Sequence, residues 1–441
     1  MPKIFFTLYA ILLAIIFAGI VVHAPLTIWL GTVVDSLLVK AWKEILMLAL
    51  LLPAIWIAVR SQLFWLRRDI LFVCIIAYAV LHLLLVAVFR PDLPVLLAGL
   101  AIDLRYLLFF VLVYVAVMVQ PAWRRHFLIV GGGMAVFSLL FAVLQVFVLP
   151  RDILASIGYG KATIAPFLTV DNNPDYVRIN GTFRGPNPLG AYGVVVMSLV
   201  VAVWLRLRRV LSTSWRWVVA IFLLVSSVLT IYVSYARSAL MAALVALGSL
   251  AVAVYGQRLL KKRSVAVVAV VCIVAVAGLF AARDTSLVQH VILHEDPQGK
   301  SQLSSNEGHF QSLVEGTQKL LTQPFGAGPG STGSASLFSD QPLIIEHQYL
   351  FVAHETGWLG LGLFVVIFGL IMQRLWRARA DWLALGTFAS GAGLAVIGLF
   401  LPVWVDDSIG IVWWGLAAIA LASNASKTKH KGGKHGRKPT N

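Results

Sequence analysis

Residues 70–89 read ILFVCIIAYAVLHLLLVAVF, a run that contains no Asp, Glu, Lys or Arg. The hydrocarbon core of a bilayer is about 30 Å thick, and a helix needs about 20 apolar residues to cross it. This run is therefore long enough to span a membrane. Similar runs recur along the chain, and they predict spans at 4–24, 44–59, 70–89, 104–120, 127–149, 186–205, 217–234, 238–256, 265–282, 348–372, 383–402 and 409–424.

The composition agrees with a chain that is embedded in lipid. Hydrophobic residues make up 60% of the 441 positions and charged residues only 12%, whereas a soluble domain carries about 25% charged residues. We expect an all-α, polytopic membrane protein of about 12 transmembrane helices. One transmembrane domain would cover residues 1–424, with two large non-cytoplasmic loops at about 150–186 and 283–346.

Basic residues lie in short clusters between the apolar runs, as in 67–68, 124–125 and 261–263. Cytoplasmic loops are rich in Lys and Arg, and these clusters alternate as expected if both termini are cytoplasmic. Membrane topology and contact with membrane lipids then explain these clusters and the net charge of +16. We therefore expect no nucleic-acid partner. The polar, basic tail at 425–441 is predicted to be disordered and cytoplasmic.

The second large loop contains the pattern of an amphipathic helix. Ser304 and Glu307 have the spacing of a capping box, and apolar residues then recur at helical period up to Leu321. Pro324 ends the pattern, and the glycines that follow from Gly326 predict a flexible turn. This turn follows a helix instead of a strand, which argues against dinucleotide binding.

Ionisable residues outside the apolar runs are the candidates for chemistry. Arg237 stands out because Ser234–Ala239 separates two spans with almost no loop, so its guanidinium faces either a polar cavity or the membrane interface. The alternative is an arginine that merely reaches towards lipid headgroups. The full set of such candidates is Arg178, Arg184, Arg237, His309, Glu346 and His347.

His347 lies at the start of a span, where a neutral imidazole can accept a proton near physiological pH. A purely structural role is the competing interpretation. The sequence has no His-Glu-x-x-His pattern, and Cys74 and Cys272 both lie inside apolar runs. We therefore expect no metal site and no cofactor.

Several segments, in this order, resemble the O-antigen ligase and O-antigen polymerase superfamily of bacterial envelope glycosyltransferases. They are GTFRGPNPLG at 181–190, SYARSA at 234–239, PFGAGPG at 324–330, HQYL at 347–350 and ETGWLG at 355–360. Two positions depart from the family pattern. Gln348 replaces the usual asparagine, and Gly308-His309 replaces a Gly-Arg pair, which puts one phosphate contact in doubt.

The resemblance implies a GT-C-like membrane enzyme that transfers a glycan from a polyprenyl-diphosphate carrier to an acceptor hydroxyl, such as lipid A-core. The reaction would invert the anomeric centre without metal, at the periplasmic face of the bacterial inner membrane. Arginines can bind a diphosphate bidentately as it leaves. The implied roles are diphosphate binding by Arg237, Arg184 and Arg178, action of His347 as general base or acceptor-orienting group, and support from Asn187, His309, Glu346 and Tyr349.

Two kinds of alternative remain open. A polysaccharide polymerase or a protein O-oligosaccharyltransferase would keep the fold and change the acceptor, and variable loops decide that choice. A small-anion transporter belongs to another class. Transporters often show inverted repeats and charges at the bilayer midplane. No convincing repeat is visible here, and most candidate charges lie at span ends, which favours the enzyme.

Overall fold

The computed structural model describes residues 3–34, 37–170, 173–207, 214–259 and 305–435. Its first half contains α1 (Lys3–Gly19), η1 (Ile20–Val22), α2 (His23–Val33), α3 (Leu37–Lys40), α4 (Trp42–Arg60), η2 (Phe64–Arg68), α5 (Ile70–Phe89), α6 (Leu93–Val119), α7 (Trp123–Phe147), η3 (Ile153–Ile157), β1 (Phe167–Val170) and β2 (Asn173–Ile179). The rest contains α8 (Pro186–Leu207), α9 (Ser214–Val233), α10 (Arg237–Leu259), α12 (Ser305–Thr322), α13 (Gly333–Ser336), α14 (Gln348–Arg377), α15 (Trp382–Ile397) and α16 (Asp407–His435).

The prediction of an all-α, polytopic membrane protein is confirmed. Within the described residues, 10 helices are long and apolar enough to cross a membrane, and α15 is a shorter apolar helix. Together they match every predicted span except 265–282, which lies outside the described residues. The first predicted span is a composite of α1, η1 and α2.

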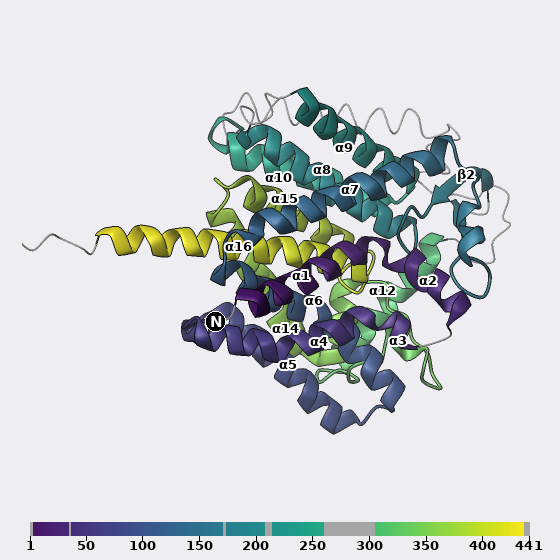
Figure 1. Cartoon of the computed structure of the whole chain (residues 1–441). Coiled ribbons are helices and arrows are strands. Elements are labelled where there is room, and N and C mark those ends of the chain that lie inside the picture. The colour runs from purple at the N-terminus through teal and green to yellow at the C-terminus, as the bar shows by residue number, and fades with distance from the viewer. Residues whose placement is uncertain (1–2, 35–36, 171–172, 208–213, 260–304, 436–441) are drawn as a thin grey trace, which may run out of the picture.

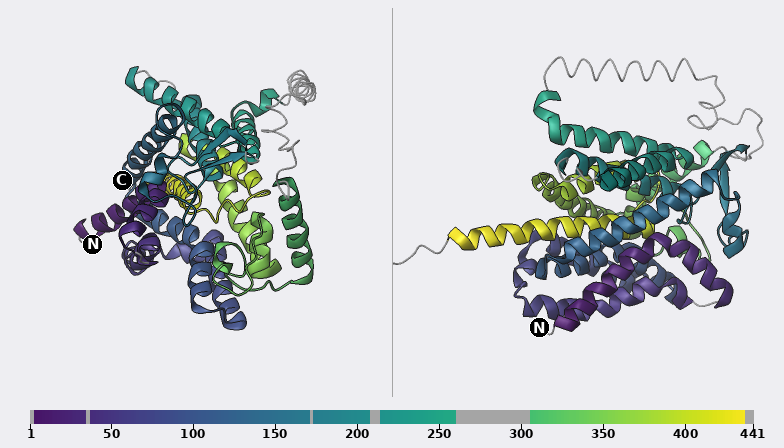
Figure 2. Two further views of the ribbon diagram at one scale, coloured as in Figure 1. Left: turned by 90° about the vertical axis from the view of Figure 1, so that its right-hand side faces the viewer. Right: turned by 45° about the horizontal axis from the view of Figure 1, so that its top comes forward.

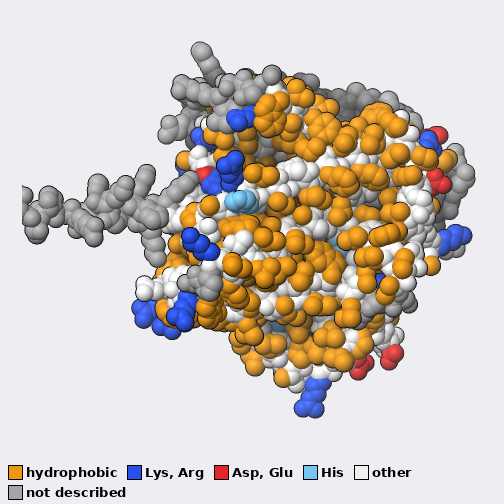
Figure 3. All heavy atoms as spheres, in the orientation of Figure 1, with side chains coloured by type: hydrophobic (Ala, Val, Ile, Leu, Met, Phe, Trp, Pro, Cys, Tyr) orange, Lys and Arg blue, Asp and Glu red, His pale blue; other side chains and the backbone are white. Residues whose placement is uncertain are grey.

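The long helices run side by side, as Figures 1 and 2 show. The β1–β2 hairpin lies at one end of the bundle, which we call the hairpin end. The C-terminal part of α16 projects from the other end, the tail end, and the described chain also begins there (Figure 1). Lys and Arg side chains gather towards the tail end on the face drawn in Figure 3. This distribution agrees with two termini on the same side of a membrane.

Helix α6 begins well before the predicted start of its span at 104. Two charged residues near that point, Asp103 and Arg105, lie inside the helix and are buried. Their charges have partners in the bundle, because Asp103 lies beside His82 and Arg105 beside Glu44. A charge that is paired inside a bundle does not have to end a membrane helix.

The first large loop contains a small antiparallel hairpin that the sequence pattern did not predict. Phe167 pairs with Ile179 and Leu168 pairs with Arg178. This pairing brings the candidate Arg178 close to the start of α8. Strands this short carry a weak sequence signal, because the alternation of polar and apolar residues extends over few positions.

The predicted helix in the second large loop is confirmed as α12, which ends at Thr322, just before Pro324. It packs against the start of α14. A side chain at Gly316 would come within 2.9 Å of Leu350 and 3.4 Å of Ile345, so the glycine permits this close approach. The fold therefore ties the second loop to the helix that follows His347.

Helix α14 is broken at Gly357, whose φ of 68° and ψ of −169° are not helical. The segment after α12 fills the break with backbone hydrogen bonds. The N–H of Ala327 donates to the carbonyl of His354 at 2.6 Å, and the N–H of Trp358 donates to the carbonyl of Pro324 at 2.9 Å. Backbone groups freed at membrane depth need such partners.

Helix α16 lies at the centre of the bundle and packs along α6. Trp404, Trp413 and Trp414 are among the largest fully buried side chains, and the Trp414 ring lies 4.9 Å from that of Tyr106 on α6. The helix continues to His435, so it extends into the tail for which we predicted disorder. Extending an existing helix costs far less than starting one, and composition alone does not register this.

Candidate functional site

Arg178 of β2 connects the two motifs that carry the other candidate arginines. Its Nη2 donates to Oδ1 of Asn187 at 2.7 Å, and its Nε donates to the carbonyl of Ser234 at 2.8 Å. Asn187 lies in the first turn of α8, and Ser234 begins the turn between α9 and α10. The guanidinium therefore holds the hairpin, α8 and this turn together at the hairpin end.

The turn before Arg237 packs tightly on α8. A Cβ added to Gly190 would lie 2.6 Å from Oγ of Ser234 and 2.9 Å from Cβ of Ala239, so the contact needs glycine. Tyr235 within the turn has a positive φ of 47°. This geometry places Arg237 at the first residue of α10, on the same side of the bundle as Arg178.

A cavity of about 420 Å³ lies beside these elements. In its wall, Nε of Arg184 donates to Oδ2 of Asp406 at 2.8 Å. The Arg184 side chain is 47% exposed while that of Asp406 is 6% exposed. The described lining comprises Ile164, Leu168, Arg184, Gly185, Pro186, Asn187, Pro188, Ala191, Ile397, Leu401, Pro402, Val403, Asp406 and Ile409. Arg184 and Asn187 thus face one cavity, while Arg237 and His347 are not among these lining residues.

Asp406 is fixed by the start of α16. Its Oδ1 accepts hydrogen bonds from the backbone N–H groups of Ser408 and Ile409, both at 3.1 Å. A carboxylate at a helix N-terminus is stabilised by these otherwise unpaired donors. Asp406 was not among the residues expected from the sequence, although Asp-Asp-Ser before an apolar run is a recognisable capping signal.

The neighbouring Asp407 is the centre of a charge network that the sequence analysis also missed. Nζ of Lys43 lies 2.8 Å from Oδ2 of Asp407, and Nη2 of Arg105 lies 2.9 Å from its Oδ1. Nζ of Lys43 also lies 3.1 Å from Oε1 of Glu44 and from Nε2 of His23. These partners come from α2, α4 and α6, so the network fixes the start of α16, and with it Asp406, against the first half of the chain.

His347 is the N-cap of α14. Its Nδ1 accepts a hydrogen bond from the N–H of Leu350 at 3.3 Å. A nitrogen that accepts carries no proton, so in the neutral ring the proton is on Nε2. Burial lowers the pKa of His347, partly opposed by a backbone hydrogen bond. The neutral ring with an Nε2–H donor is therefore the form that this position favours.

The start of α14 is attached to the end of α15, next to the cavity. The N–H of Gln348 donates to the carbonyl of Gly398 at 2.9 Å, and Oε1 of Gln348 accepts from the N–H of Trp404 at 2.8 Å. The hydroxyl of Tyr349 donates to the carbonyl of Ala395 at 3.2 Å. Gln348 thus holds the 398–404 segment, part of which lines the cavity.

The remaining candidates are distributed around this end. The backbone N–H of Glu346 donates to Oγ of Ser312 on α12 at 2.9 Å, and the His347 ring lies 5.7 Å from the ring of Tyr349. The backbone of His309 is part of α12. The described residues contain no group of three or more His, Cys, Asp or Glu side chains that could hold a metal ion.

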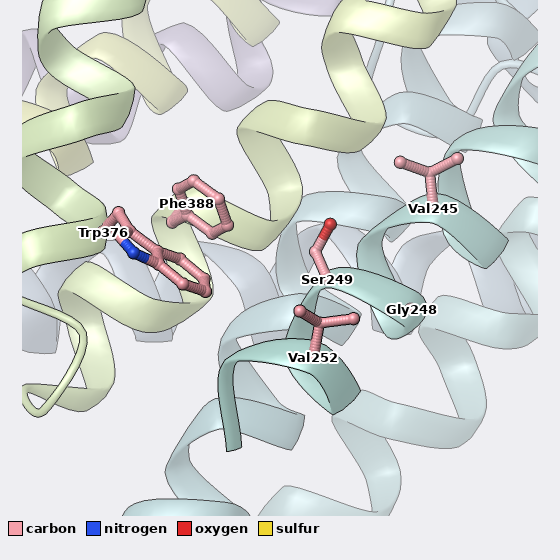
Figure 4. Close-up of a pocket in the computed structure, with 6 residues that line it drawn as sticks. All are labelled: Val245, Gly248, Ser249, Val252, Trp376 and Phe388. Atoms are coloured by element: carbon pink, nitrogen blue, oxygen red, sulfur yellow. The ribbon is translucent and has the colours of Figure 1, made fainter. Parts of the chain in front are cut away.

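A second hollow, of about 470 Å³, is apolar and lies between α10, α14 and α15. In Figure 4, Val245, Ser249 and Val252 of α10 face Trp376 of α14 and Phe388 of α15. No atom lies within 4 Å of a Cβ built at Gly248, so this glycine widens the hollow. Its lining suits a hydrocarbon chain.

Neither the models of known protein families nor the curated proteins contain a match to this chain.

Proposed function

We propose that this protein transfers a glycan from a polyprenyl-diphosphate carrier to an acceptor hydroxyl at the hairpin end of the bundle. The observation that carries the proposal is the cavity in which Arg184 and Asp406 form an ion pair beside Asn187. A cation for an anionic donor and a carboxylate for an alcohol acceptor then lie side by side. The apolar helices around them suit a lipid-linked donor.

Arginines supply the charge that this reaction needs. As the acceptor oxygen bonds to the anomeric carbon, the bond from that carbon to the phosphate oxygen breaks and its electron pair stays on the diphosphate. Arg237 at the start of α10 would bind this leaving group, and Arg184 would add a second cation at the cavity. Fixed cations stabilise such developing charge without reorganisation. Arg178 is the residue that positions both segments.

The acceptor proton needs a base, and two residues are candidates. Nδ1 of His347 is occupied as the helix cap, so the neutral ring offers an N–H donor, which suits orientation of the acceptor or the diphosphate. Use of His347 as a base would require the ring to release the cap. Both carboxylate oxygens of Asp406 accept hydrogen bonds, but each has two lone pairs, so Oδ2 in the cavity wall keeps one for a proton. We assign proton acceptance to this oxygen, because its use leaves the helix cap on Oδ1 in place. A positioned base contributes about 10²–10⁴-fold in rate.

The lipid part of the donor would lie along the apolar helices. The hollow between α10, α14 and α15 can take a section of a hydrocarbon chain, and α10 also begins with Arg237. One helix would thus contact both the diphosphate and the lipid. A polysaccharide polymerase or a protein O-oligosaccharyltransferase would use the same donor chemistry with another acceptor.

The test is release of free polyprenyl diphosphate from a glycan-loaded carrier by the purified protein in proteoliposomes that contain native acceptors. We expect release by the wild type and its loss in Arg237→Ala and Asp406→Asn. Arg60→Ala is the matched control, because Arg60 is exposed at the far end of α4. Wild-type protein that folds but releases no diphosphate would overturn the proposal.

A small-anion transporter is the second candidate, and the broken helix α14 favours it. Discontinuous helices often form the substrate site of transporters near the bilayer midplane, and α14 is interrupted at Gly357 by the 324–328 segment. Uptake of a labelled anion into the same proteoliposomes, without release of diphosphate, would support transport over glycan transfer.

A further inference from the structure

Three ionisable side chains meet inside the bundle, away from the cavity. His82 of α5 is 0% exposed, Asp103 of α6 is 6% exposed and Glu355 of α14 is 1% exposed. Nε2 of His82 lies 3.4 Å from Oδ2 of Asp103, and the carboxyl group of Asp103 is near enough to that of Glu355 to act on it electrostatically. Ionisable groups inside membrane helices are expensive and are usually kept for a function.

The hydrogen bonds of His82 determine where its first proton lies. Nδ1 of His82 is 2.8 Å from the carbonyl oxygen of Tyr78. A carbonyl can only accept, so Nδ1 carries a proton. In a neutral ring, Nε2 would then have a lone pair facing the carboxylate oxygen of Asp103, which is repulsive. A proton between Nε2 and Oδ2 removes the conflict, and neither atom has a hydrogen-bond partner among the described residues.

Glu355 also has a buried atom that lacks a hydrogen-bond partner within the described residues. Its Oε1 accepts a hydrogen bond from the N–H of Thr332 at 3.3 Å, whereas Oε2 is buried with no hydrogen-bond partner in the described chain. Two neighbouring carboxyl groups in a low-dielectric interior cannot both ionise at neutral pH. A proton on Oε2 that points to Asp103 would leave Oε1 as the carbonyl-like acceptor that Thr332 needs.

The charges nearby do not neutralise this cluster. Arg105, two residues from Asp103, directs its guanidinium to Glu44 and Asp407. The surrounding titratable groups are Tyr78 on α5, Tyr106 on α6 and His354 on α14, and Lys319 of α12 acts on His354. With no guanidinium or ammonium paired to it among the described contacts, the cluster gains most from a net charge of zero.

We propose that His82, Asp103 and Glu355 form a buried proton-binding site that holds two protons against the charge of Asp103, one on Nε2 of His82 and one on Oε2 of Glu355. His82 is then a cation, Asp103 an anion and Glu355 neutral. The ligand of this site is the proton itself. Its assignment rests on the geometry of these three side chains and is independent of glycan transfer.

The site is connected to the segment that leads to His347. Glu355 accepts from the backbone of Thr332, and Oγ1 of Thr332 accepts from the N–H of Ile345 at 3.1 Å. Oγ1 of Thr332 also donates to the carbonyl of Leu343 at 3.0 Å. Loss of the proton from Glu355 would put a second negative charge beside Asp103, and the repulsion would displace the side chain that holds Thr332. Proton occupancy thereby supports the position of His347.

Infrared spectroscopy of the full-length protein in a detergent without ester groups tests the proposal, because a protonated carboxyl group has a C=O stretching band that a carboxylate lacks. At neutral pH we expect one such band in the wild type, its loss in Glu355→Gln and its displacement in Asp103→Asn, which changes the partner of the Glu355 proton. The matched controls Asp92→Asn and Glu315→Gln alter exposed carboxylates and should leave the band unchanged.

Two outcomes would overturn the assignment. One is a folded wild-type protein without the band at neutral pH, and the other is a band that both Glu355→Gln and Asp103→Asn leave unchanged. Circular dichroism of each variant checks folding. If Glu355→Gln does not fold, two spectra still decide the question. The wild-type spectrum shows whether the band exists, and the Asp103→Asn spectrum shows whether it is displaced.

Discussion

Arg184 and Asp406 form an ion pair in the wall of the cavity at the hairpin end, with Nε of Arg184 2.8 Å from Oδ2 of Asp406. The two residues are far apart in sequence and come from the loop before α8 and the loop before α16. The pair therefore joins two segments of the cavity wall that no local sequence pattern connects.

Asp406→Asn separates the charge of this residue from its capping role. Asparagine caps helices about as well as aspartate, so we expect stability within about 1 kcal/mol of the wild type. A positioned base contributes about 10²–10⁴-fold in rate, so diphosphate release should fall by about that factor. Initial rates in proteoliposomes and unfolding in detergent measure the two effects.

Asp340→Asn is the matched control for that variant, because Asp340 is an exposed carboxylate and should keep wild-type rates. An Asp406→Asn protein with full activity would show that the carboxylate is not the proton acceptor.

Arg178→Lys tests whether the guanidinium acts as a brace between α8 and the turn before Arg237. Lysine keeps the charge but lacks the planar fork that reaches both Asn187 and Ser234. We expect a folded protein whose diphosphate release falls about tenfold, as for the loss of one charged hydrogen bond. Arg151→Lys, an exposed position in the same loop, is the control. Equal rates in the two variants would contradict the bracing role.

Gly357→Ala should disrupt the break in α14. The residue has a φ of 68°, and an added Cβ would lie 2.4 Å from the carbonyl oxygen of Pro324 and 2.6 Å from the carbonyl carbon of Phe325. Backbone strain of this kind costs about 1–3 kcal/mol. We therefore expect a lower unfolding temperature, measured in detergent.

Gly362→Ala in the same helix has no atom within 4 Å of the new Cβ, so it should match or exceed the wild type, since alanine favours helix by up to about 1 kcal/mol. If both variants unfold at the wild-type temperature, the break at Gly357 is not a strained, glycine-dependent feature.

The sequence alone predicted the apolar architecture well, because membrane spans depend on local composition. The bounds of α5, Ile70–Phe89, match the predicted span, since the run begins directly after the capping residue Asp69 and ends before Arg90. The start of α10 at Arg237 was likewise visible, as the turn before it is short. Such features are determined by residues that are close together in the sequence.

The network around Asp407 could not be predicted in the same way. Lys43, Arg105 and Asp407 are brought together by packing of α4, α6 and α16, and each looks alone like a charge that limits a span. The β1–β2 hairpin was also missed because its strands are short. Pairing between distant segments is a property of the tertiary structure, and the local patterns of a single sequence do not predict it.

His347 predicts a pH dependence of stability. Burial lowers its pKa below the ordinary value of about 6.5, so the unfolded chain binds this proton more readily than the folded one. Stability should therefore fall as the pH drops below about 6.5. A proton on Nδ1 would also face the N–H of Leu350 and remove the cap.

His347→Asn should weaken this dependence, because asparagine caps a helix without titrating. His126→Asn, at an exposed histidine, should leave the dependence unchanged. The measurement is detergent unfolding between mildly acidic and neutral pH. An identical acid response in wild type and His347→Asn would assign it to other groups.

Lys43→Met tests whether the buried network holds the start of α16. Nζ of Lys43 is buried and lies between Asp407 and Glu44, and its removal leaves two half-buried carboxylates to share the guanidinium of Arg105. Breaking a buried ion pair costs about 3–5 kcal/mol, so we expect a marked fall in unfolding temperature. Lys40→Met, an exposed lysine in α3, should have little effect.

Lys43→Met should also affect activity. Because Asp406 precedes Asp407, diphosphate release should fall as well, even below the unfolding temperature. A stable, fully active Lys43→Met protein would show that Arg105 alone positions the site.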